Sequence, residues 1–161
     1  MTAIAVTGHL DLSDRTVPLV REELRALLAP HRAAGLTGLS CLAPGADSLF
    51  AEEVLAAGGR LVAVLPSARY RRWLAEPDRP RYDRLLGRAA EVVVLPHREQ
   101  SDAAYQAANA ELLRRADLVV AVWDGRPGRG LGGTADMVAT ARRAGVPVRV
   151  VWPDGSARQA A

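Results

Sequence analysis

The chain has 161 residues with a formal net charge of +3, 49% hydrophobic and 24% charged residues, which suffices for the core of one globular domain. Apart from histidine, its basic residues are all arginine and are scattered, which argues against the concentrated basic patch of a nucleic-acid-binding protein. The single cysteine, Cys41, excludes an internal disulfide bond, and without a signal peptide or a membrane-length apolar run we expect a cytoplasmic protein with no membrane partner.

Apolar runs rich in β-branched residues alternate with helical patterns along the whole chain. The predicted strands, in chain order, are 3–7, 39–42, 61–65, 91–95, 117–123 and 146–152. The predicted helices are 13–29, 47–57, 81–89, a helix from an N-cap at Ser101 to 116, and 134–144. Between 67 and 80 the two prolines and several arginines predict an irregular segment with a short helix around 69–74.

Continuous apolar strands joined by crossovers of a dozen or more residues are typical of a parallel sheet that is covered on both faces. We therefore predict an α/β protein with a single Rossmann-like, doubly wound, mostly parallel sheet of about six strands and helices on both faces. This domain is expected to span 1–153, with a flexible C-terminal tail at 154–161. In such folds, ligands bind beyond the carboxyl ends of the strands, where the strand order reverses.

Glycine-containing turns follow three of the predicted strands, at Thr7–His9, at Ala43–Asp47 and between Asp124 and Thr134. The last of these turns leads from a buried strand directly into a helix. Free backbone N–H groups and the positive end of a helix dipole at such a position favour phosphate or another anion. Because glycine also lets the backbone approach a ligand closely, these turns predict a binding site for an anionic small molecule.

The strongest anion contacts are expected in the last turn, where Thr134 can also cap its helix and donate its hydroxyl. The full set of expected ligand-binding residues is Gly8, His9, Gly45, Ala46, Asp47, Asn109, Asp124, Gly125, Gly130, Gly132, Gly133 and Thr134.

Several of these residues also have a purely structural interpretation. His9 can donate to a phosphate or act as an acid or base, or it is an exposed turn residue. Asp47 can accept from a ribose hydroxyl or simply cap a helix. The Asn109 amide can both donate and accept a hydrogen bond from a ligand, or it is a plain surface residue. Asp124-Gly125 contacts the ribose or the base, or it only marks a turn.

Several common catalytic and cofactor patterns are missing from the sequence. His9, His31, His97 and Cys41 are too scattered for a zinc site, so no metal is expected. There is no G-x-S-x-G elbow, no Walker A motif and no G-x-G-x-x-G after the first strand. These absences argue against a nicotinamide dehydrogenase, and we expect no cofactor.

Four segments together resemble one known superfamily: Ile4–His9, Leu42–Asp47, Asp117–Asp124 and Gly132–Asp136. This Rossmann-like superfamily includes the cytokinin-activating phosphoribohydrolases (often misnamed lysine decarboxylases), DNA-processing protein A and the nucleotide-sensing, SLOG-like domains of bacterial defence systems. The resemblance extends over roughly 3–152. It implies a nucleotide or nucleotide-derived ligand at the glycine-rich turns.

The chain departs from the phosphoribohydrolases at two positions. Their helix arginine falls on Ala108, and the glutamate of their P-G-G-x-G-T-x-x-E motif falls on Met137. Neither side chain can perform acid–base chemistry. The nucleotide-sensing domains are the better match, through Gly132–Asp136 and the preceding Trp-Asp-Gly.

The sequence therefore favours a non-catalytic or weakly catalytic protein that binds a nucleotide-like small molecule. A nucleoside-monophosphate phosphoribohydrolase is the first alternative, with Asp124 or Asp136 as the carboxylate that stabilises the ribosyl transition state. Single-stranded DNA binding is the second, and an aromatic content of 4% argues against it. The resemblance also implies a homodimer, with an apolar face formed by Leu85, Leu86, Leu112 and Leu113.

Overall fold

The computed structural model describes residues 1–128 and 132–160, and its centre is a six-stranded sheet in which all neighbouring strands are parallel. The strands are β1 Thr2–Gly8, β2 Leu36–Ser40, β3 Arg60–Leu65, β4 Glu91–Val94, β5 Leu118–Val122 and β6 Val148–Val151. Their order across the sheet is β4-β3-β2-β1-β5-β6. This order confirms the predicted doubly wound fold.

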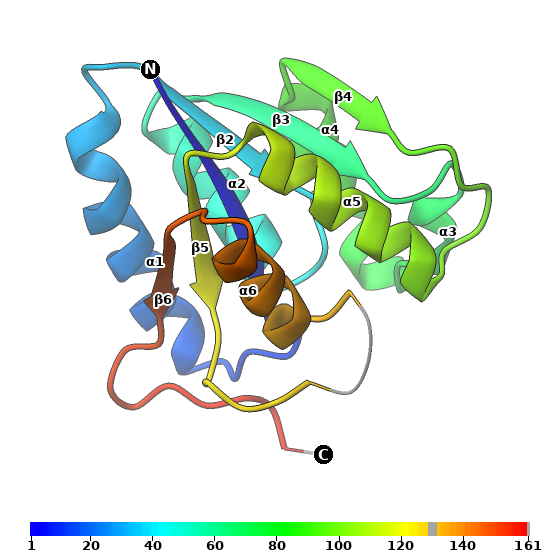
Figure 1. The fold of residues 1–161 in the computed structure, drawn as a ribbon. Helices are drawn as coiled ribbons and strands as arrows, with labels where there is room; N and C mark the ends of the chain where they lie inside the picture. Colours follow the sequence, from blue (N-terminus) through cyan, green and yellow to red (C-terminus); the bar gives the residue numbers. More distant parts are fainter. Residues whose placement is uncertain (129–131, 161) are drawn as a thin grey trace.

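Helices cover both faces of this sheet (Figure 1). They are α1 Thr16–Leu28, α2 Ala46–Ala56, α3 Tyr70–Trp73, α4 Arg79–Arg88, α5 Asp102–Arg115 and α6 Thr134–Arg143, with short 3₁₀ helices at Ala29–His31 and Glu76–Asp78. Helices α1 and α2 lie on one face, and α5 and α6 lie on the other. Within 1–128 and 132–160, no helix has the length and apolar character needed to cross a membrane.

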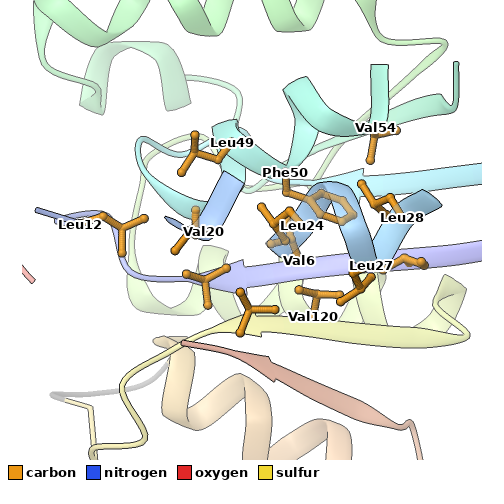
Figure 2. Close-up of a cluster of buried hydrophobic side chains, with 14 of the residues drawn as sticks. Val6, Leu12, Val20, Leu24, Leu27, Leu28, Leu49, Phe50, Val54 and Val120 are labelled. Atoms are coloured by element: carbon orange, nitrogen blue, oxygen red, sulfur yellow. The ribbon is translucent and has the colours of Figure 1, made fainter. Parts of the chain in front are cut away.

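Strand β1 lies in the middle of the sheet and is buried on both faces. Ile4 and Val6 belong to the apolar cluster that α1 and α2 form. Figure 2 shows Val6 near Leu24 and Phe50. Ala5 points the other way, into the cluster beneath α5 and α6. Burial on both faces explains why the central strands appear in the sequence as continuous apolar runs rather than as alternating patterns.

The second strand lies earlier in the chain than its apolar pattern predicts. It ends at Ser40, whereas the prediction placed it at 39–42. The Ser40 hydroxyl accepts a hydrogen bond from Leu42 N at 3.0 Å and donates one to the Asp47 carbonyl, also at 3.0 Å. Leu42 has a φ of +57°. Cys41 and Leu42 are therefore buried in a turn, and their apolar character extends the strand-like pattern beyond the strand itself.

The C-terminal tail, expected to be flexible, is hydrogen-bonded to the loop between β1 and α1. Ala157 N donates to the Thr16 hydroxyl at 2.7 Å, and Ser13 N donates to the Ala157 carbonyl at 3.0 Å. Arg158 forms an ion pair with Asp11 at 2.8 Å. These contacts are polar and join residues more than 140 positions apart, so no apolar pattern in the tail signals them.

The apolar face expected for a dimer is not present on the surface. Leu85 and Leu112 are buried in the core, and Leu86 and Leu113 pack against it from partly buried positions. The prediction took these four leucines as exposed, but both helices turn them toward the sheet.

Candidate functional site

A pocket of about 220 Å³ lies at the carboxyl edge of the sheet. The strand order reverses there, since the chain leaves β1 toward β2 and later returns to β5 on the opposite side of β1. Strands β1 and β5 end level with each other, with Gly8 opposite Val122. The pocket is lined by Val6, Thr7, Gly8, Leu10, Cys41, Ala43, Asp47, Asp102, Tyr105, Asn109, Leu112, Gly132, Gly133 and Thr134. It therefore occupies the position where ligands bind in open α/β sheets.

Half of the residues expected to bind a ligand come together at this pocket, although they are far apart in the sequence. Those that line it are Gly8, Asp47, Asn109, Gly132, Gly133 and Thr134. Those that lie outside its lining are His9, Gly45, Ala46, Asp124 and Gly125. Gly130 falls outside the described residues.

Gly8 and Gly45 allow close packing between elements. A Cβ on Gly8 would overlap the Ala46 side chain and lie 2.9 Å from the Val122 carbonyl oxygen. Gly45 has a φ of +79°, and a Cβ there would lie 2.5 Å from the His9 carbonyl oxygen. That carbonyl accepts a hydrogen bond from Ala46 N at 3.1 Å. These contacts bring β1, β5 and the start of α2 together, which is a structural reason for glycine at both positions.

Asp47 lies in the first turn of α2, and its carboxyl group is only 8% exposed. Its Oδ2 accepts one long hydrogen bond, of 3.4 Å, from Ala43 N. Burial raises the pKa of Asp47 to about 7. Burial also raises the pKa of the neighbouring Cys41 thiol well above its ordinary value, so that thiol stays protonated.

The Gly132 turn is held in place from two sides. The Asn109 side-chain amide donates to the Gly132 carbonyl at 3.2 Å, and Gly132 N donates to the Asp136 carboxylate at 2.8 Å. Gly132 has a φ of +85°, and a Cβ there would lie 2.7 Å from the Cβ of Tyr105. Asn109 and Asp136 thus fix one wall of the pocket, a positioning role that the sequence analysis missed. An Asp four residues after a glycine, just inside a helix, is the local signal for it.

Helix α6 begins at the pocket with an N-cap that has no side-chain hydrogen bond. The N-cap is Gly133, and Thr134 is the first helical residue rather than the expected cap. The first intrahelical bond runs from Met137 N to the Gly133 carbonyl at 2.9 Å. The backbone N–H groups before Met137 belong to the first helical turn, which leaves them without intrahelical acceptors. Gly133 and Thr134 line the pocket, so this positive helix end faces it.

His9 and Asp124 join the ends of β1 and β5 beside the pocket. His9 is only 8% exposed, and its Nε2 lies 3.1 Å from Asp124 N and 3.2 Å from the Asp124 carboxylate. Its ring packs edge-on against Trp152. Burial lowers the pKa of His9, with a smaller contribution from Arg158, so the ring is neutral near pH 7 and Nε2 accepts from Asp124 N.

The positions of the phosphoribohydrolase arginine and glutamate lie in the core. Ala108 on α5 and Met137 on α6 are both 0% exposed and belong to the same apolar cluster against the sheet. The Asp136 carboxylate is already bonded to Gly132 N. The Asp124 carboxylate accepts from Arg126 N at 2.9 Å and lies outside the pocket lining. No acid–base group therefore stands where the resemblance to a hydrolase requires one.

A group of aromatic side chains extends from the pocket along the same edge. Tyr105 lines the pocket and its hydroxyl lies 3.3 Å from that of Tyr70. Trp73 stacks on Tyr70 with ring centroids 5.6 Å apart and is 46% exposed. We expected a short helix here but not this group, because Tyr70 and Trp73 lie on α3 whereas Tyr105 comes from the distant α5.

Neither a known protein-family model nor a curated protein sequence matches the chain. Several solved structures have a similar fold. DNA processing protein A (DprA) from Streptococcus pneumoniae matches with a TM-score of 0.71 at 18% identity, over 96% of this chain and 52% of that one. DprA from Helicobacter pylori, described for its single-stranded DNA binding mode, matches with a TM-score of 0.70 at 13% identity, over 98% and 68%.

The molybdenum cofactor binding protein from the phototrophic bacterium Rippkaea orientalis matches with a TM-score of 0.60 at 18% identity, over 95% of this chain and 77% of that one. The chain spans about half the length of the Streptococcus pneumoniae protein, so the likeness covers one part of that molecule. The backbone of this chain has the Rossmann-like fold that the resemblance implied.

Proposed function

We propose that the pocket binds a nucleotide or a nucleotide-derived small molecule and that the protein acts by binding rather than by catalysis. The observation that carries this proposal is the position of the α6 N-terminus, which faces a pocket at the point where the strand order reverses. Backbone N–H groups at a helix start and the helix dipole favour a phosphate. The phosphate would bind at Gly133 and Thr134, and the rest of the ligand would extend toward Asp47.

Proteins with this fold bind ligands of different kinds. One is described as binding single-stranded DNA and another as binding the molybdenum cofactor. The fold alone therefore does not choose between a small molecule and a polymer, and the residues of the pocket carry the argument. The core positions of Ala108 and Met137 favour binding over hydrolysis.

The test is a thermal-shift measurement against nucleoside mono-, di- and triphosphates, ADP-ribose and cyclic nucleotides. A ligand at 100 times its Kd stabilises the folded state by about 2.7 kcal/mol, which corresponds to a rise in Tm of about 5–10 °C for a domain of this size. We expect Thr134→Val or Gly133→Asp to reduce the shift. Thr140→Val, on the same helix but outside the pocket lining, is the matched control and should keep it.

The proposal fails if no compound in this panel raises the Tm. It also fails if Thr140→Val reduces the shift as much as Thr134→Val does. Release of free base during the incubation would instead support the hydrolase alternative.

Single-stranded DNA binding is the second candidate because the exposed Trp73 could stack on a base. The surrounding basic charge is partly neutralised, since Arg69 pairs with Glu99 at 2.6 Å and Arg71 pairs with Asp83 at 2.8 Å. If DNA binds here, its affinity must fall steeply with salt and Trp73→Ala must weaken it. If DNA binding depends neither on salt nor on Trp73, this DNA site is ruled out and only the small-molecule proposal stands.

A further inference from the structure

The Asp47 carboxyl group has more hydrogen-bonding capacity than the protein uses. Its Oδ2 accepts only the 3.4 Å bond from Ala43 N, and in the described part of the chain no group donates to Oδ1. An ionised carboxylate offers about four acceptor sites, and buried polar groups are normally satisfied. This carboxyl group is more than nine-tenths buried and lines the pocket. Among the described residues Oδ1 is not one of the fully buried atoms without a partner, so solvent reaches it through the pocket, and a bound ligand must replace the donors that solvent supplies.

The surroundings restrict what can supply those donors. Among the described residues, no arginine or histidine lines the pocket. The Asn109 side-chain amide donates one of its two N–H groups to Gly132, and no bond from the other to Asp47 is present in the described chain. Ala43 N donates to Asp47, and burial together with the Asp47 charge raises the pKa values of the Cys41, Tyr70 and Tyr105 side chains. The hydroxyl groups of Tyr105 and Thr134 also line the pocket, but neither donates to Asp47 in the described chain. A ligand that displaces solvent from this carboxylate must therefore supply donors of its own, and a pair of N–H groups matches its two oxygens.

We propose that the Asp47 carboxylate recognises the heterocycle of the ligand and selects a ring edge with two adjacent N–H donors, as in guanine. This inference rests on the proposed function above. The two carboxylate oxygens accept two parallel N–H bonds in the same fork geometry that they use for a guanidinium group. Adenine and cytosine instead present a ring-nitrogen acceptor beside the amino donor, and that lone pair would face the carboxylate.

The charge state of the neighbouring groups agrees with this role. Burial, with a smaller contribution from the Asp47 charge, raises the pKa values of Cys41, Tyr70 and Tyr105, and all three are neutral near pH 7. The pKa of Asp47 is about 7, so near pH 8 the carboxylate is mostly ionised and without a cationic partner in the described chain. Two ligand N–H donors would replace its lost hydration and favour the ionised form.

The experiment is isothermal titration calorimetry of the full chain at pH 8 with guanosine, inosine and adenosine 5′-monophosphates. Guanosine and inosine monophosphates share the same phosphate and ribose and differ by the single exocyclic amino group. We expect guanosine monophosphate to bind at least tenfold more tightly than the other two, because a hydrogen bond to an ionised group accounts for about that factor.

The variants assign the preference to one residue. Asp47→Asn keeps the shape of the side chain and should reduce the guanosine-to-inosine ratio of affinities to less than about threefold. Asp102→Asn removes the other carboxylate that lines the pocket and should leave the ratio unchanged.

The outcomes separate this inference from the proposed function. Equal binding of guanosine and inosine monophosphates by the wild-type chain, or tighter binding of adenosine monophosphate, overturns the role of Asp47 but keeps the nucleotide pocket. Loss of the preference in Asp102→Asn rather than in Asp47→Asn also overturns it. If none of the three compounds binds and the broader nucleotide panel is also negative, the proposed function fails and this inference fails with it.

Discussion

The buried Asp47 carboxyl group makes a sharp prediction about the pH dependence of stability. Its pKa is about 7 in the folded protein, against an ordinary value of 3.8, because burial disfavours the charged form. The unfolded chain therefore ionises first as the pH rises. The stability linked to this group is fully present below pH 3.8 and is lost as the pH rises toward 7.

The difference between the two pKa values corresponds to about 4 kcal/mol in total, at about 1.4 kcal/mol per pKa unit. About 3 kcal/mol of this loss in stability occurs between pH 5 and pH 8.5. The position of Asp47 in the first turn of α2 favours its ionised form by at most about 1 kcal/mol, which does not reverse the sign. Asp47→Asn keeps the shape but cannot ionise. Its stability relative to the wild type should rise by about 3 kcal/mol between pH 5 and pH 8.5.

The assay is urea denaturation at several pH values, followed by tryptophan fluorescence, with the free energy of unfolding compared at each pH. Asp102→Asn removes one negative charge from an exposed position at the same pocket and is the control for a general charge effect. A difference between wild type and Asp47→Asn that stays constant from pH 5 to pH 8.5 would refute the reasoning. So would an equal pH dependence in the Asp102→Asn control.

Three further predictions follow from the contacts around the pocket. Gly8→Ala should destabilise the protein by about 1–3 kcal/mol because the added Cβ has no room. Gly87→Ala, in open space on α4, should instead stabilise it by about 0.5–1 kcal/mol. Urea denaturation of both variants measures the two changes, and equal changes in the free energy of unfolding would contradict the packing role of Gly8. Asn109→Ala removes the donor to the Gly132 carbonyl. The variant should bind the nucleotide more weakly in calorimetry, while its stability falls by only about 1 kcal/mol. Unchanged affinity would argue against the role of Asn109 in positioning the Gly132 turn. Because burial lowers the pKa of His9, protonation destabilises the folded state. The wild type should therefore lose stability relative to His9→Gln as the pH falls below 6.5. A difference in the free energy of unfolding between the two proteins that does not change with pH in that range would contradict the lowered pKa of His9.

The sequence predicts the architecture well because the central strands are buried on both faces and each crossover is helical. The boundaries of α5 and α6 follow from local signals, such as the Ser101 side chain that accepts from Ala104 N at 3.1 Å. The error at β2 arises where local signals conflict with tertiary structure. Burial of Cys41 and Leu42 in a turn gives them the same apolar pattern that a strand would have.

The site is only partly readable from the sequence. The strand order brings the glycine-containing turns to one edge, and general rules for α/β folds predict that edge. The roles within it depend on contacts between distant residues: Asn109 reaches the Gly132 carbonyl across 23 positions. Glycine is required at Gly8 and Gly45 by neighbouring backbone and side chains. A glycine that allows close packing and a glycine that allows a ligand to approach look the same in a sequence.

Helix α5 has one side that faces the pocket and another that packs in the core. Tyr105 and Asn109 face the pocket, whereas Ala108 is turned by about 100° from Asn109 and packs against the sheet. An arginine at position 108 would place a guanidinium group in an apolar cluster, where an unpaired charge is strongly unfavourable. The orientation of this helix is therefore incompatible with an arginine at this position. The same orientation presents an amide and a phenol to the pocket, which supports the proposal that the protein binds a ligand rather than cleaves it.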